Sequence, residues 1–230
     1  MKKSERAMPL LLEFVGVAAT SMVLYAALLR SGQVFGAIAA GLLFAGVNAA
    51  ARPNYVAQLN PIVTLGLWMA RKLSTLRTLV TIGVQMLGGL VAWRLSELIL
   101  DRPLSSLAGD KFNWSIFTAE LLGAFVFTFL LSLVLFSKKL DDGKLYLVGF
   151  AALTVGMLIA SMPQGAFGII NPALALGIQS WSWTFVLGPL AGGFIGMNVV
   201  PMMQAMDARS AKQAKKSVKK SSKKSPKKRK

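Results

Sequence analysis

The sequence contains two short apolar segments that begin with Asn-Pro: Asn60-Pro61-Ile62-Val63-Thr64-Leu65-Gly66 and Asn171-Pro172-Ala173-Leu174-Ala175-Leu176-Gly177. Asn is a favoured helix N-cap, and Pro is favoured at the first helical position because its missing N–H would have no partner there. Each dipeptide therefore predicts the start of a short helix. These helices, Asn60 to Met69 and Asn171 to Gln179, are too short to cross a bilayer, which needs about 20 residues.

Longer apolar segments lie around these two short ones. The chain has 230 residues, of which 54% are hydrophobic and 15% charged, and this composition is typical of a membrane protein. The first segment is longer than the apolar core of a signal peptide, so we expect it to be retained. The sequence thus predicts an all-α membrane protein with six spans, at Pro9 to Leu29, Val34 to Ala50, Leu73 to Leu95, Ser115 to Phe136, Leu145 to Ser161 and Trp183 to Met203.

The two halves of the chain share further motifs at corresponding positions. The first span of each half opens with Glu-x-x-Gly, at Glu13 and at Glu120, and the third span of each half carries a Gly-Gly pair. Paired interruptions in corresponding positions are typical of inverted repeats with a site at the membrane midplane. We therefore expect a channel domain over residues 1–206, built from repeats of about 1–110 and 111–206.

Two helix N-termini that meet at the midplane favour passage of uncharged molecules. The positive ends of the helix dipoles oppose cations, while the Asn side chains donate hydrogen bonds to water and interrupt a proton-conducting chain. The sequence has no His and no Cys, which removes imidazole and thiol chemistry. We expect a passive channel for water or small uncharged solutes, without enzymatic activity, cofactor or metal.

These motifs, together with Gln85, Gly88 and Gly188-Pro189, resemble those of the aquaporins, or major intrinsic proteins, from the N-terminus to about Met206. The resemblance implies a six-helix bundle with two re-entrant half-helices, a pore in each subunit and usually a homotetramer. It also implies roles for individual residues. Glu13 and Glu120 would be structural anchors that accept hydrogen bonds from the re-entrant backbone, and the constriction would comprise Asn60, Pro61, Ile62, Asn171, Pro172 and Ala173.

The sequence departs from the usual family pattern at two places. Ile62 follows the first Asn-Pro where the family usually has Ala, and Leu174 stands where the second motif is usually followed by Arg. Matching each motif to its upstream helix without gaps places the outer selectivity filter at Ala40, Ile159, Gly168 and Leu174. Such a filter has no charge and no aromatic ring, so the sequence is more similar to the unorthodox branches, the small basic intrinsic proteins and the superaquaporins.

The C-terminal segment carries most of the formal net charge of +17, because twelve basic residues and one acidic residue follow Met206. Residues 207–230 are rich in Lys and Ser and cannot form a core, so we expect a disordered tail. Its simplest partner is anionic lipid rather than nucleic acid, since the spans hold it at a membrane. The terminal Lys227-Lys228-Arg229-Lys230 has the form of a dilysine retrieval signal for the endoplasmic reticulum.

The basic residues between the spans predict the orientation. One set of loops and termini holds the tail and Lys2, Lys3, Arg6, Arg52, Arg71, Lys72, Lys138, Lys139 and Lys144, whereas the opposite loops hold Arg30, Arg102 and Lys111. Both termini should therefore be cytosolic.

Two other functions fit some of these features. A secondary transporter also uses inverted repeats with broken helices, and it would need Glu13 or Glu120 as an ionisable group near the midplane. A non-conducting membrane organiser would act through the basic tail alone.

Overall fold

The computed structural model describes residues 3–30, 32–51, 55–109, 111–137 and 141–224, and within these ranges the regular structure is entirely α-helical. Among the helices in these ranges, six are long and apolar enough to cross a membrane. They are α1 (Lys3–Arg30), α2 (Gln33–Ala50), α4 (Thr75–Leu100), α5 (Trp114–Leu135), α6 (Asp142–Ala160) and α8 (Trp183–Lys224). The predicted all-α membrane fold with six spans is confirmed.

The two Asn-Pro segments form the remaining helices, α3 (Pro61–Met69) and α7 (Pro172–Gly177). Asn60 and Asn171 are their N-caps, and a proline occupies the first turn of each. Side-chain caps start other helices too, because Asn113 caps α5 and Asp141 caps α6. These caps supply partners for N–H groups that have none inside the helix.

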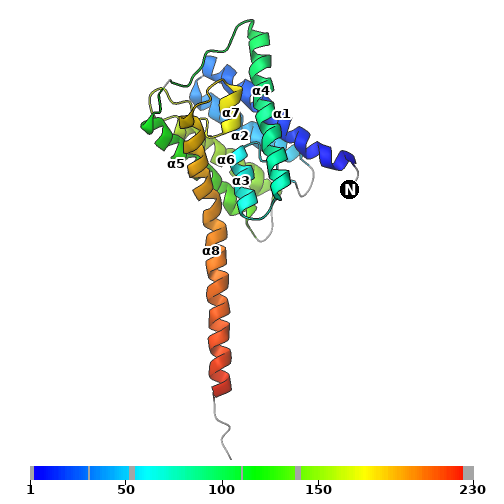
Figure 1. The fold of residues 1–230 in the computed structure, drawn as a ribbon, viewed down its shortest axis with the longest axis vertical. Helices are drawn as coiled ribbons and strands as arrows, with labels where there is room; N and C mark the ends of the chain where they lie inside the picture. The colour runs from blue at the N-terminus through cyan, green and yellow to red at the C-terminus, as the bar shows by residue number, and fades with distance from the viewer. Residues whose placement is uncertain (1–2, 31, 52–54, 110, 138–140, 225–230) are drawn as a thin grey trace, which may run out of the picture.

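The two halves of the chain have equivalent helix contacts. The first helix of each half packs against the second and the fourth, so that α1 contacts α2 and α4, and α5 contacts α6 and α8. The half-helices cross over, because α3 packs against α8 and α7 packs against α4. Figure 1 shows α7 in the upper part of the bundle and α3 in the lower part, and the two short helices contact each other.

Glycines on α4 and α8 allow the half-helices to approach closely. A Cβ atom at Gly89 of α4 would collide with the backbone carbonyl of Ala173 in α7. A Cβ atom at Gly193 of α8 would collide with the side chain of Ile62 in α3. One glycine of each Gly-Gly pair, Gly89 or Gly193, is therefore the place where a half-helix meets the last helix of the other half.

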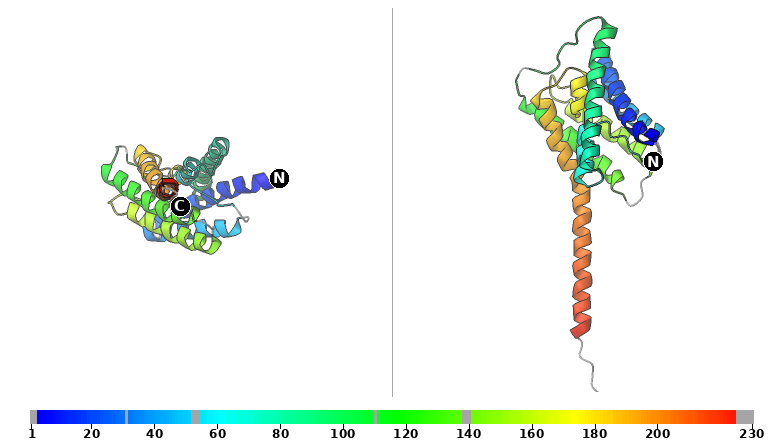
Figure 2. Two further views of the ribbon diagram at one scale, coloured as in Figure 1. Left: turned by 90° about the horizontal axis from the view of Figure 1, so that it is seen from below. Right: turned by 45° about the vertical axis from the view of Figure 1, so that its right-hand side comes forward.

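The C-terminal part of α8 extends beyond the bundle (Figures 1 and 2). We expected disorder from Asp207 onward, but the helix continues to Lys224, and every residue from Met202 to Lys216 is exposed. Ala, Lys and Gln are good helix formers, which favours continuation of the helix although it has no packed face. The Lys227–Lys230 motif, Lys2, Arg52, Lys138 and Lys139 lie outside the described residues.

Candidate functional site

The structure brings Asn60 and Asn171 together, and each side chain has two functions. The Oδ1 atom of Asn60 accepts a hydrogen bond from the N–H of Ile62 (2.9 Å), and that of Asn171 accepts from the N–H of Ala173 (3.0 Å). Each amide nitrogen donates to the backbone of the opposite half. Nδ2 of Asn60 lies 3.0 Å from the carbonyl oxygen of Ile170, and Nδ2 of Asn171 lies 2.8 Å from that of Leu59.

Both asparagines line a narrow cavity inside the bundle. The space open to the centre of a water molecule is about 10 Å³, which is about enough for one water. One part of the wall is polar and consists of Asn60, Asn171, Thr20 and Gln58, while the rest is apolar. The apolar lining residues are Ala40, Phe44, Leu59, Phe127, Leu153 and Leu174.

Glu13 of α1 is fully buried and accepts four hydrogen bonds. Its Oε1 atom accepts from the hydroxyl of Tyr55 (2.6 Å) and the N–H of Gln58 (2.7 Å). Its Oε2 atom accepts from the N–H of Leu59 and from Nε2 of Gln85, both at 2.7 Å. The carboxylate thus binds the backbone that leads into Asn60 and joins it to α4.

Glu120 of α5 occupies the equivalent place in the second half. It is also fully buried, and its two carboxylate oxygens accept from the N–H groups of Ile169 (2.9 Å) and Ile170 (2.6 Å). Hydrogen bonds from two successive backbone N–H groups satisfy a buried carboxylate that would otherwise be costly. In each half, a buried glutamate therefore holds the two residues that precede the Asn-Pro dipeptide.

Leu59 and Ile170 adopt a backbone conformation that is unfavourable for their side chains. Their φ angles are 53° and 40°, in the left-handed region that a β-branched residue such as Ile170 rarely enters. Such residues cost on the order of 1–3 kcal/mol each and need support from their surroundings. That support reaches both backbone groups of each residue. A glutamate accepts a hydrogen bond from its N–H, and an asparagine of the other half donates one to its carbonyl.

Some of the residues that the sequence assigned to the constriction and filter line this cavity, and others do not. Ala40 and Leu174 line the cavity, together with the two asparagines. Pro61 and Pro172 lie in the first turns of α3 and α7. Among the described residues, those that line the cavity do not include Ile62, Ala173, Ile159 or Gly168.

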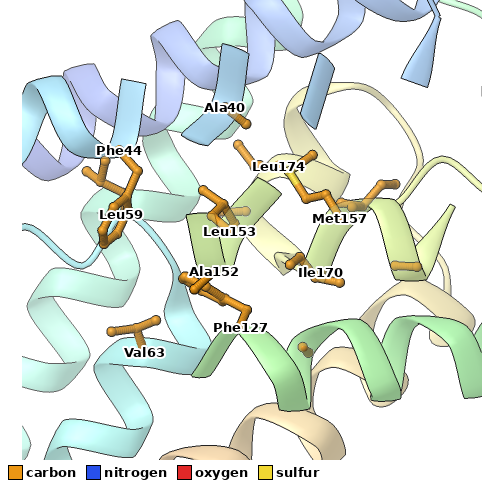
Figure 3. Packing of buried hydrophobic residues seen from close by; sticks show 14 of the residues in the cluster. Ala40, Phe44, Leu59, Val63, Phe127, Ala152, Leu153, Met157, Ile170 and Leu174 are labelled. Atoms are coloured by element: carbon orange, nitrogen blue, oxygen red, sulfur yellow. The ribbon is translucent and has the colours of Figure 1, made fainter. Parts of the chain in front are cut away.

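Packing explains where these four residues lie instead. Ile62 packs against Gly193 of α8, and the carbonyl of Ala173 faces Gly89 of α4. Gly168 has a φ of 63° and lies against the carbonyl of Met157, while Ile159 is half-buried near the end of α6. On α6 the cavity is lined by Leu153, and Figure 3 shows Met157 beside Leu174.

Sequence reasoning missed several lining residues and one further anchor. Thr20 and Phe127 each lie seven residues after the buried glutamate of their half, so they occupy equivalent positions of the two repeats. Asn48 of α2 holds the segment before the first half-helix, because its Oδ1 accepts from the N–H of Ala57 (2.9 Å) and its Nδ2 donates to the carbonyl of Ala57 (3.1 Å).

A six-helix membrane bundle with two re-entrant half-helices and paired asparagines in a shared cavity defines a class of membrane channels. A family model described as major intrinsic protein matches residues 5–200. The chain therefore belongs to the major intrinsic protein family. Members of this family are channels and not enzymes.

Individual relatives agree with this assignment. The chain is 31% identical to aquaporin TIP1-1 of Arabidopsis thaliana, over 78% of this chain and 75% of the relative. It is 33% identical to a probable aquaporin, PIP2-7, of Oryza sativa, over 60% of this chain and 54% of the relative, so the match spans about half of that protein. The fold is similar to the X-ray structure of the aquaglyceroporin from Plasmodium falciparum, with a TM-score of 0.63, 18% identity and coverage of 83% and 91% of the two chains.

Proposed function

We propose that the chain is a passive channel for water and small uncharged solutes, in which Asn60 and Asn171 orient the permeating molecule. The observation that carries the proposal is that each asparagine donates a hydrogen bond to the backbone of the opposite half. Their Oδ1 atoms are used as helix caps, so toward the cavity the two amides act as hydrogen-bond donors. Each NH₂ group has two hydrogens, and the backbone carbonyl of the opposite half takes one of them.

The two asparagine amides and the helix N-termini that they cap exclude protons and cations. A water molecule that accepts from both amides directs its own hydrogens away from the asparagines, so it cannot pass a proton from one neighbour to the next. The N-caps of α3 and α7 line the same cavity, and the positive dipole ends of these helices oppose cations. No acid, base or metal is needed for this selectivity.

An apolar outer part of the lumen supports weak discrimination among small neutral solutes. Ala40 and Leu174 line the cavity and offer neither charge nor hydrogen bond. We propose that the outer filter also includes Ile159 and Gly168, as the spacing predicts, and that Leu174 in place of Arg puts the chain with the unorthodox branches of the family.

The buried carboxylates favour the channel over a secondary transporter. All the carboxylate oxygens of Glu13 and Glu120 accept hydrogen bonds, and both residues bind backbone N–H groups. We propose that they are structural anchors, because a group that carries protons in a transport cycle must exchange its partners. Transport that survives conversion of either residue to Gln would support this assignment.

The test compares water permeability of proteoliposomes by stopped-flow light scattering. Asn60→Asp and Asn171→Asp keep a good N-cap but replace the donor amide with an acceptor oxygen facing a carbonyl, so we expect a loss of water permeability of about tenfold or more. Asn113→Asp makes the same change at the cap of α5, outside the cavity, and should have no effect. Unchanged permeability in both lumen variants would contradict the proposal.

Further proposals concern the oligomeric state of the channel, its membrane and its C-terminal helix. We propose a homotetramer with both termini in the cytosol, in the membrane of the endoplasmic reticulum if Lys227–Lys230 acts as a retrieval signal. The exposed Arg209, Lys212, Lys215 and Lys216 fit an anionic lipid surface. The alternative, a non-conducting organiser, requires that deleting residues 211–230 abolishes function while a blocked pore does not.

The lipid proposal can be tested in the intact protein because the chain has no Cys. A fluorophore on Ala211→Cys should be quenched by a headgroup quencher in phosphatidylserine vesicles at low salt. The quenching should fall at high salt, since salt screens surface attraction. Equal quenching in neutral and anionic vesicles would contradict the proposal that the C-terminal helix binds anionic lipid. Mass determination in detergent tests the tetramer.

A further inference from the structure

We propose that an aromatic pair inside the lumen, Phe44 and Phe127, sets the upper size of the solutes that pass. This inference rests on the proposed channel function, but it moves the size limit from the outer filter to a different part of the cavity. Neither residue belongs to the Asn-Pro motifs or to the filter positions expected from the sequence.

The two rings come from opposite halves and meet in the cavity that the asparagines line. Phe44 lies on α2 and Phe127 on α5, with ring centroids 6.0 Å apart and the ring planes at 90°. Both rings line the cavity together with Leu59 and Leu153. Figure 3 shows Phe44 beside Leu59, with Leu153 between this pair and Leu174.

Phe44 lies one helical turn beyond Ala40 on α2, so the two residues line successive levels of the lumen. At the level of Ala40, the wall has a side chain of a single methyl group. At the level of Phe44, two aromatic rings form the apolar side of the wall, opposite the polar side chains of the same cavity. The bulk of the apolar wall therefore lies at the aromatic pair.

Packing fixes the rings in place. Phe44 is 2% exposed and Phe127 is 1% exposed. A Cβ atom at Gly149 of α6 would collide with the ring of Phe44, so the ring lies directly over the backbone of this glycine. Close packing on α6 and the edge-to-face contact between the rings both oppose rotamer changes that would widen the lumen.

The available space separates water from larger solutes. A cavity of about 10 Å³ accepts about one water molecule, and the polar side formed by Thr20, Asn60 and Asn171 can bind it. Glycerol is several times larger than water, and the hydroxyl groups on its far side would meet the two rings, which offer no hydrogen bond. We therefore expect the wild-type channel to exclude glycerol while it passes water.

The experiment measures water and glycerol permeability of proteoliposomes that contain the full chain. Removal of one ring in Phe44→Ala or Phe127→Ala should raise the ratio of glycerol to water permeability by about tenfold or more, as expected when a steric block is removed. Phe185→Ala removes an equally buried ring of α8 that is not among the lining residues, and should leave the ratio unchanged. The milder Phe44→Leu and Phe127→Leu serve if an alanine variant does not fold, with a smaller increase expected.

The outcomes separate this inference from the proposed function. Wild-type water permeability that is abolished by Asn171→Asp, with an unchanged glycerol ratio in all ring variants, overturns the aromatic limit but leaves the channel intact. Glycerol permeability that rises in the ring variants supports the inference whether or not the wild type passes water well. No permeability in any of these proteins, all correctly folded, overturns both.

Discussion

The contact between Ile62 and Gly193 predicts the effect of adding a single methyl group. The motif usual in the family has Ala at the position of Ile62, and the larger side chain fits here because Gly193 of α8 has no Cβ atom. Gly193→Ala should therefore force α3 away from α8. Because α3 begins at Asn60, the displacement would also reach the cavity.

The magnitude follows from the packing. Overpacking a dense core by one methyl group costs about 1–3 kcal/mol, and Ile62→Ala alone leaves a cavity that costs about 2–5 kcal/mol. In the double variant the new methyl group occupies part of that cavity, and the collision disappears. The double variant should therefore be more stable than the sum of the single effects by about 0.5–3 kcal/mol, the range found for residues in contact.

The assay is thermal unfolding of the purified channel in detergent, combined with water permeability in proteoliposomes. Gly192→Ala is the matched control, because its Cβ atom would collide with the backbone carbonyl of Leu121 and not with Ile62. Ile62→Ala should rescue Gly193→Ala and should not rescue Gly192→Ala. If the effects of Gly193→Ala and Ile62→Ala add to within about 0.5 kcal/mol, the two side chains are not coupled and this reasoning is wrong.

Three further predictions concern the groups around the cavity. Glu120→Gln and Glu13→Gln each leave one buried backbone N–H without an acceptor, so both should lower stability by about 1–3 kcal/mol, measured by the unfolding midpoint. Asn48→Ala removes both hydrogen bonds to Ala57 and should cost about as much, whereas Asn48→Asp, which keeps the acceptor, should cost less. Leu174→Arg places a longer, charged side chain in a lumen that holds about one water, so water permeability should fall about tenfold, while Leu174→Met stays near wild type. Equal permeability of the Arg and Met variants would show that Leu174 is not at the narrow part.

The spans and the half-helices could be predicted from the sequence because the membrane imposes simple rules. A span needs about 20 apolar residues, and a backbone that enters without crossing needs a capped start. The predicted starts at Asn60 and Asn171 agree with the structure to the residue, since an N-cap followed by Pro fixes where a helix begins. Apart from the C-terminal end of α8, the boundaries of the long helices differ by up to six residues, because apolar length alone does not define a helix end.

The wall of the lumen could be predicted only in part. Spacing from the motifs leads to Ala40 and Leu174, which line the cavity, and to Ile159 and Gly168, whose place in the outer filter stays a prediction. The place of Gly168 depends on how the segment between α6 and α7 turns, because Gly168 has a positive φ there. Phe44 was missed because an aromatic residue in an apolar span looks the same whether it faces a lumen, a neighbouring helix or lipid.

The C-terminal segment shows the limit of composition as a guide. Abundant Lys and Ser predicted disorder, because the segment has no apolar face to bury. However, α8 is already a helix when it leaves the bundle, so each further residue extends an existing helix and no new nucleus is needed. Lys, Ala and Gln have favourable helix propensity, and this is sufficient to continue the helix to Lys224.

The hydrogen bonds at the centre make the two halves of the channel interdependent. Glu13 binds the N–H of Leu59, whose carbonyl accepts from Asn171, and Glu120 binds the N–H of Ile170, whose carbonyl accepts from Asn60. The glutamate of one half thus fixes the carbonyl that positions the asparagine of the other half. Because the backbone of each of these two residues is held in a strained conformation at its N–H and at its carbonyl, neither asparagine can move without releasing a carbonyl of the opposite half. The donor geometry on which selectivity depends is therefore a property of the paired repeats, and a single half-helix with its own glutamate would not reproduce it.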